Sequence, residues 1–174
     1  LLANAPPSHE IPFEVLQDIR RKGGGLLAFQ QYSEKAENIQ VNYGNHKVTI
    51  RIFNHDSPDF VYLHIHGGGH CIGAADMQDQ SLEKISNDLN CAVVSVEYRL
   101  APANPYPAAP DDCEAAAIWL IENSKSQFNT EKIVIGGESA GANLSAVTLQ
   151  RLKSKGLLDN VCLLYTSPSP RDVE

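Results

Sequence analysis

Residues 132–146, KIVIGGESAGANLSA, are the stretch that most clearly indicates the fold, because they join a short apolar strand to an alanine-rich helix through a tight turn. The apolar pattern predicts the strand at Lys132–Ile135 and the helix at Ala140–Lys153. The turn at 137–141 fits G-x-S-x-G, in which a sharp strand-to-helix bend lifts the serine hydroxyl above the edge of a sheet. Ser139 is therefore the candidate nucleophile.

A second glycine turn is expected at the same edge. Residues 66–69, HGGG, follow the apolar segment Phe60–Ile65, which we interpret as a buried strand. Successive glycines let main-chain N–H groups approach a ligand closely. Ligand sites in open α/β sheets lie at the carboxyl ends of the strands, so the two turns are expected to meet there. Donors so placed hold the oxyanion of a tetrahedral intermediate, together with the N–H that follows the serine.

The remaining patterns complete an alternation of strands and helices. Apolar spacing predicts a helix from near Phe13 until the glycines at 23–25, a hairpin over 39–52, a helix at Asp79–Leu89 and a strand at Cys91–Val96. A Pro-rich loop without regular structure is expected at Ala101–Pro110, followed by a helix capped by Asp111 or Asp112. This order is typical of a three-layer α/β fold, with an antiparallel N-terminal hairpin, a mostly parallel sheet and helices on both faces.

Composition excludes several classes of protein. The 174 residues are enough for one domain or for part of a larger one. A net charge of −7 argues against a nucleic-acid partner, which would require a basic face. No apolar run approaches the roughly 20 residues of a membrane span. The four cysteines lack close pairing, so we expect no disulfide framework, no zinc site and a reducing, cytoplasmic compartment.

Three motifs in order resemble the hormone-sensitive-lipase-like family of α/β-hydrolases. They are HGGG at 66–69, YRLAP at 98–102 and GESAG at 137–141, within a similarity that covers residues 60–150. The resemblance implies that Ser139 is the nucleophile and that the oxyanion donors are Gly68, Gly69 and Ala140. It also implies that four residues support the two loops: His66, Gly67, Gly137 and Gly141. Residues 1–38 would form a cap-type helical segment and residues 39–161 the N-terminal part of the hydrolase core.

The implied function is a carboxylic ester hydrolase that forms an acyl-enzyme on small or medium acyl esters, without cofactor or metal. Amide, lactone or carbamate cleavage is also compatible with the fold. A different class of protein, a non-catalytic receptor for small molecules on the same scaffold, stays open as an alternative. The two differ in whether an acid and a histidine complete the serine chemistry.

The order of residues bears on that question. α/β-hydrolases carry the serine first, then Asp or Glu, then His. All six histidines of this chain precede Ser139 (His9, His46, His55, His64, His66 and His70), so we expect the fold to be incomplete at its C-terminus and the chain alone to lack useful esterase activity. His66 is interpreted as a brace for the glycine loop rather than the base. Glu138 is expected to make a structural hydrogen bond, and no carboxylate or cysteine near His64, His66 and His70 completes a metal site.

The end of the chain carries a different signal. Residues 162–172, CLLYTSPSPRD, resemble the in-frame translation of a sequencing adapter. We therefore interpret residues 162–174 as a tail that does not belong to the native fold. The alternative is that the apolar segment Val161–Tyr165 forms a natural sixth strand.

Overall fold

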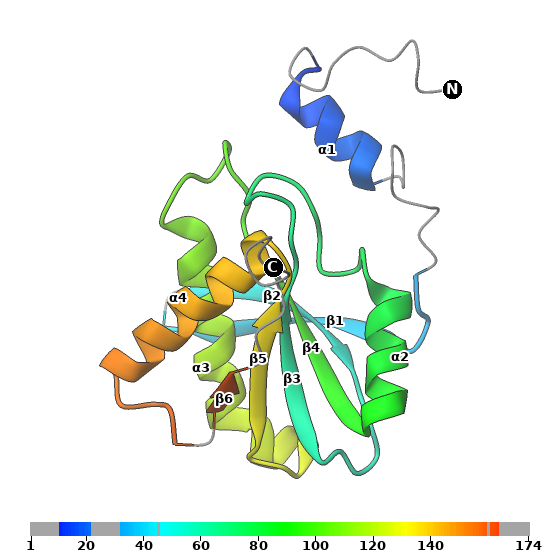
Figure 1. Cartoon of the computed structure of the whole chain (residues 1–174), viewed down its shortest axis with the longest axis vertical. Helices are drawn as coiled ribbons and strands as arrows, with labels where there is room; N and C mark the ends of the chain where they lie inside the picture. Colours follow the sequence, from blue (N-terminus) through cyan, green and yellow to red (C-terminus); the bar gives the residue numbers. More distant parts are fainter. Residues whose placement is uncertain (1–10, 22–31, 45, 160, 164–174) are drawn as a thin grey trace, which may run out of the picture.

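The computed structural model describes residues 11–21, 32–44, 46–159 and 161–163. Its centre is a six-stranded sheet in the order β1-β2-β4-β3-β5-β6 (Figure 1). The strands are β1 (Ala36–Tyr43), β2 (His46–Phe53), β3 (Phe60–Ile65), β4 (Cys91–Glu97), β5 (Ile133–Gly137) and β6 (Val161–Leu163).

The sheet is antiparallel at one side and parallel elsewhere. β1 and β2 form the expected hairpin, in which Ile39 opposes Ile50, and β2 continues antiparallel to β4. β3 pairs in parallel with both β4 and β5, and β5 pairs in parallel with β6. The carboxyl ends of β3 and β5 therefore lie side by side, where the sequence places HGGG and GESAG.

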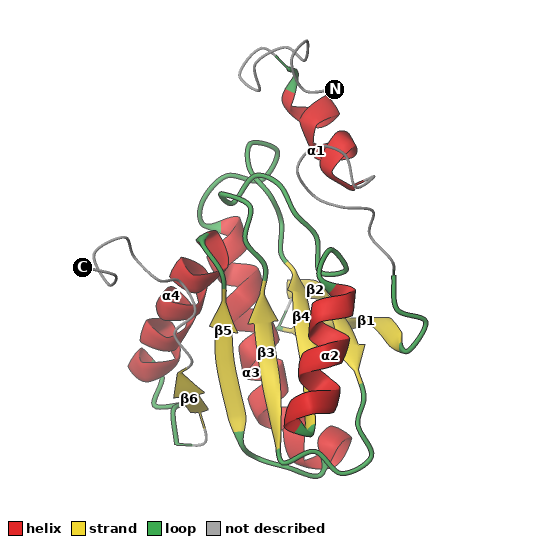
Figure 2. Cartoon of the chain, turned by 45° about the vertical axis from the view of Figure 1, so that its right-hand side comes forward, coloured by secondary structure: helices red, strands yellow, loops and turns green. Residues whose placement is uncertain are grey.

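Helices cover both faces of the sheet. α2 (Asp79–Leu89) packs on one face, and α3 (Ala108–Phe128) and α4 (Ala140–Ser154) pack on the other (Figure 2). Alternate residues of each strand serve the two layers, because successive side chains point to opposite faces. Leu63 of β3 belongs to the core under α3 and α4, whereas Tyr62 packs with Leu82 of α2. The predicted α/β class is confirmed.

α1 (Phe13–Arg21) lies beyond the loops that follow the parallel strands, away from the body of the sheet (Figures 1 and 2). The helix predicted from Phe13 is thus confirmed, while the glycines expected to end it lie outside the described residues. The division into a cap-type segment at 1–38 and a core at 39–161 stays a prediction. The same holds for the tail at 162–174, of which only Cys162 and Leu163 are described, as part of β6.

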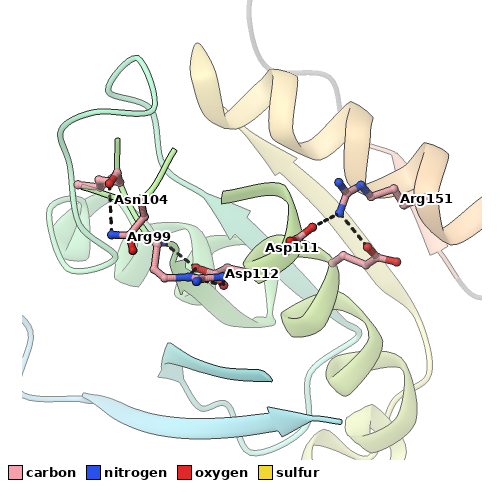
Figure 3. Close-up of polar contacts among 7 residues, drawn as sticks. Arg99, Asn104, Asp111, Asp112 and Arg151 are labelled. Carbon is pink, nitrogen blue, oxygen red and sulfur yellow. Dashed lines mark hydrogen bonds and ion pairs between the residues drawn. The ribbon is translucent and has the colours of Figure 1, made fainter. Parts of the chain in front are cut away.

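The prediction for the start of α3 is wrong. The helix begins at Ala108, within the segment expected to lack regular structure, and its N-cap is Pro107, which makes no side-chain capping bond. Pro110 is accommodated because N–H groups in the first turn have no acceptor within the helix. Asp111 and Asp112 therefore lie inside the helix and form ion pairs instead of a cap (Figure 3).

These ion pairs join α3 to its neighbours. Asp112 accepts from the main-chain N–H of Arg99 at 2.8 Å and from its guanidinium at 2.9–3.1 Å, which holds the segment after β4 against the helix. Asp111 accepts from Arg151 of α4 at 2.7 Å. Within the described residues, no helix is long and apolar enough to span a membrane.

Candidate active site

Ser139 occupies a strained turn between β5 and α4. Its backbone has φ 53° and ψ −117°, a combination that side chains disfavour and that glycine tolerates. The residue is exposed at the carboxyl edge of the sheet. Ala140 is the first residue of α4. Its N–H therefore has no acceptor within the helix and points out of the N-terminal end of the helix.

Glycines around Ser139 allow the turn to press against β3. A Cβ added to Gly137 would lie 2.0 Å from the carbonyl oxygen of Ile65, and one added to Gly141 would lie 1.8 Å from the same atom. No side chain fits at these distances without moving the backbone. The two glycines thus bring the serine turn directly onto the strand that leads into HGGG.

The glycine loop has a backbone that L side chains rarely adopt. Gly68 has φ 121° and Gly69 has φ 62°. The carbonyl of Gly68 accepts from the N–H groups of Cys71 and Ile72 at 3.1 and 3.0 Å, which closes a turn after the loop. A Cβ on Gly68 would lie 1.9 Å from the carbonyl oxygen of Ile72, so this turn requires glycine there.

His66 is buried beneath this loop, with 2% of its surface exposed. Its ring lies on the ring of Tyr98, with centroids 4.1 Å apart and planes at 14°. Nδ1 is 2.7 Å from the carbonyl oxygen of Gly67, so it must carry the proton of this hydrogen bond. Burial lowers the pKa of His66 to about 4, and the ring is neutral at pH 7. These contacts attach the ring to Gly67 and Tyr98, and the role of His66 as a brace for the loop stays a prediction.

Tyr98 is a residue that sequence reasoning missed. Its hydroxyl donates to the carbonyl of His66 at 2.9 Å while its ring supports the imidazole. The residue is 2% exposed, and burial raises its pKa. Its place at the start of the YRLAP motif is the signal that would have found it.

Glu138 binds the first glycine of the HGGG loop, the residue before α2 and a histidine of β3. One carboxylate oxygen, Oε1, accepts from the N–H of Gly67 at 2.6 Å and from the amide of Gln78. The other, Oε2, lies 3.1 Å from Nε2 of His64. The structural hydrogen bond expected for Glu138 is confirmed, although its partners were not foreseen.

A cavity of about 600 Å³ opens beside these loops, a volume in the range of small-molecule sites. His70 borders it next to the glycine loop, and Asn143 and Leu144 border it on α4, one turn after Ser139. Ser139 itself is not in its wall. The other lining residues come from the 101–110 segment and from α4: Ala101, Asn104, Tyr106, Ala109, Pro110, Val147, Gln150, Arg151 and Ser154.

α1 contacts the turn that follows the glycine loop. The side-chain amide of Gln17 donates to the carbonyl of Cys71 at 2.6 Å.

In the part of the chain that the structure describes, no three His, Cys, Asp or Glu side chains are grouped as metal ligands. His64 is bound to Glu138 and Ser95, and His66 to Gly67.

Comparison with known proteins identifies the family to which this chain belongs. A family described by the alpha/beta hydrolase fold matches residues 62–174. The carboxylic ester hydrolase LipN of Mycobacterium tuberculosis is 40% identical over 92 residues, which are 52% of this chain and 24% of that protein. An arylesterase of Saccharolobus solfataricus is 32% identical over 138 residues, 76% of this chain and 45% of that protein.

A solved arylesterase structure superposes with a TM-score of 0.72 at 26% identity, covering 91% of this chain and 52% of the other. The chain thus spans about a quarter to a half of the length of these curated relatives. Residues 62–174, which the family matches, contain both glycine turns, all of β5 and most of β3. On sequence and on structure, the chain belongs to the family of proteins with the α/β-hydrolase fold.

Proposed function

We propose that this chain carries the nucleophile and the oxyanion site of a serine carboxylic ester hydrolase. The observation that supports it most is the backbone of Ser139, at φ 53° on a turn pressed against the strand that enters HGGG. Strain of this kind persists where the surroundings impose it and is concentrated at active sites. The esterases among the relatives point to the same chemistry.

In the proposed mechanism, the hydroxyl of Ser139 attacks the acyl carbonyl and forms a tetrahedral intermediate. The main-chain N–H groups of Gly68, Gly69 and Ala140 stabilise the negative oxygen. Collapse of the intermediate releases the alcohol, and water then cleaves the acyl-enzyme. Small or medium acyl esters are the substrates we propose, and neither step requires a cofactor or metal. The non-catalytic receptor alternative has no support among the named relatives.

The proton transfers need a base that takes the proton of Ser139. In the described structure, His64 and His66 are 2% exposed; His64 is bound to Glu138, and His66 is bound to the carbonyl of Gly67. No histidine follows Ser139 in the sequence. We therefore expect the 174-residue chain alone to show no measurable turnover of a short p-nitrophenyl ester.

The proposal is tested by labelling the chain with a fluorophosphonate probe while imidazole in solution supplies the missing base. We expect an adduct on Ser139, located by mass spectrometry, that forms faster with imidazole and is absent from Ser139→Ala. The matched control is Ser126, an exposed serine on α3. Labelling of Ser139 no faster than that of Ser126 would refute the hydrolase proposal.

A further inference from the structure

The contacts of Glu138 link the two loops of the proposed site. Glu138 belongs to the serine turn, and Gly67 is the first glycine of HGGG. The distance of 2.6 Å between Oε1 and the Gly67 nitrogen is that of a charge-assisted hydrogen bond. A Cβ on Gly67 would lie 2.9 Å from the carbonyl oxygen of Glu138, so the two segments also touch through their main chains.

The carboxylate is ionised at neutral pH. Burial alone would raise the pKa of Glu138, but the hydrogen bond from His64, the charge interaction with His64 and the bond from Gly67 together lower it below its usual value of 4.5. The other titratable groups facing it are His66, Tyr62 and Tyr98. None of these three is charged at pH 7, because burial lowers the pKa of His66 to about 4 and raises those of both tyrosines.

His64 holds the second oxygen of this carboxylate in place. Its Nε2 must donate to Oε2, because an ionised carboxylate only accepts. On the other side of the ring, the hydroxyl of Ser95 lies 3.0 Å from Nδ1. The Ser95 hydroxyl can donate to or accept from this ring nitrogen, so it occupies the second nitrogen of His64. Ser95 is fully buried in β4, so the chain of hydrogen bonds runs from the central sheet to the glycine loop.

Gln78 fixes the first oxygen from the side of α2. The residue directly precedes Asp79, whose buried carboxylate accepts from Nε of Arg51 in β2 at 2.8 Å. The start of α2 is therefore anchored to the sheet, and with it the amide that donates to Glu138. Three separate elements thus orient one carboxylate toward one main-chain N–H group.

We infer that Glu138 is a positioning residue that locks the glycine loop to the serine turn through the N–H of Gly67, with His64, Ser95 and Gln78 orienting its carboxylate. The inference rests on the proposed function, since it concerns how the oxyanion donors are held relative to Ser139. With Gly67 fixed, Gly68 and Gly69 keep their unusual backbone angles beside the serine. Without the lock, we expect the loop to sample other conformations.

Amide hydrogen exchange in the full chain tests the lock directly. In Glu138→Ala we expect the Gly67 amide to exchange at least tenfold faster, while amides of β3 and β4 keep their protection. The matched control is Glu97→Ala, because Glu97 accepts from the N–H of Ala75, also at 2.6 Å, outside the serine turn. That variant should accelerate exchange at Ala75 and leave Gly67 unchanged.

A second variant separates charge from packing. Glu138→Gln keeps the volume and one acceptor oxygen but loses the charge, so we expect Gly67 protection between those of the wild type and of Glu138→Ala. We expect the short bond to shift the Gly67 amide proton downfield in the wild type, and we expect this proton to move upfield in Glu138→Gln. Gly67 protection equal to the wild type in Glu138→Gln would show that the ionised carboxylate is not what holds the loop, and it would overturn the inference of a charge-assisted lock. Unchanged Gly67 exchange in Glu138→Ala would do the same.

The labelling of Ser139 distinguishes this inference from the proposed function. If the wild type reacts with the fluorophosphonate, we expect Glu138→Gln to react several-fold more slowly and Glu97→Ala to react at the wild-type rate. An equal rate in Glu138→Gln would contradict the inference. If the wild type does not react, the hydrolase proposal fails, while exchange at Gly67 still decides whether the lock exists.

Discussion

The interior of the sheet and its carboxyl edge follow different physical rules. In the interior, residues such as Leu63 and Val94 are fully buried, and other apolar side chains of similar volume would satisfy the packing. At the edge, a Cβ added to Gly137 or Gly141 would lie about 2 Å from the carbonyl oxygen of Ile65, and the backbone of Ser139 is strained. Residues in the interior are therefore constrained by side-chain volume, whereas residues at the edge are constrained by backbone geometry.

The largest expected effect is that of Gly141→Ala. An added Cβ would lie 1.8 Å from the carbonyl oxygen of Ile65, so either β3 or α4 must shift. We expect a loss of unfolding free energy above about 4 kcal/mol, measured by urea denaturation, or no folded protein at all. Gly156→Ala is the control. No atom lies within 4 Å of its added Cβ, and its φ of 72° costs only about 1 kcal/mol. Similar losses in both variants would show that the close contact with Ile65 does not set the cost of a side chain at this edge.

The interior should respond to volume alone. Leu63→Ala removes a fully buried side chain between β3 and the α3–α4 layer. We expect a loss of about 3 to 4 kcal/mol in urea denaturation, the usual cost of such a cavity. Leu89→Ala, at a position 56% exposed on α2, should lose less than about 1 kcal/mol. A small effect at Leu63 would mean that the interior repacks more freely than its burial indicates.

The edge should also be sensitive to acid through His66. Protonating its Nε2 would bury an N–H that has no partner among the described residues, which is consistent with the lowered pKa of about 4. The unfolded state binds a proton below about pH 6.5 and the folded state only below about pH 4, so stability falls as the pH falls between these values. We expect a loss of up to about 3 kcal/mol over this window.

Urea denaturation at pH 7 and pH 4.5 measures this loss. His66→Gln, which cannot titrate, supplies the control, and its stability should fall less over the same window. An equal fall in both proteins would assign the acid sensitivity to other groups.

The smallest expected effect has the opposite sign. Ser139→Gly should raise the unfolding free energy by about 1 kcal/mol, because glycine adopts φ 53° and ψ −117° without the strain that a side chain imposes. Ser139→Ala, which keeps a Cβ, should leave stability close to the wild type. The two melting temperatures give the comparison, and a destabilised Ser139→Gly would contradict the strain at the serine turn.

Much of the fold could be predicted from local pattern. β3 and α2 have the bounds expected from their apolar spacing, and the hairpin follows from alternation around a turn. The start of α3 could not be predicted in this way. Asp111 and Asp112 have the sequence signature of a helix cap. Their carboxylates instead form ion pairs with Arg151 and Arg99, respectively, which lie 12 or more residues away in the chain. Long-range ion pairs leave no trace in local pattern.

The candidate site divides in the same manner. The α/β alternation and the two glycine-bearing turns could be read from the sequence, because strand periodicity and the special backbone of glycine are local properties. Three other features emerge only from the folded chain: β3 and β5 are neighbours, Tyr98 supports His66, and Glu138 binds Gly67. Such partners are brought together by the parallel pairing of strands that lie about 70 residues apart, and no spacing along the chain encodes that pairing.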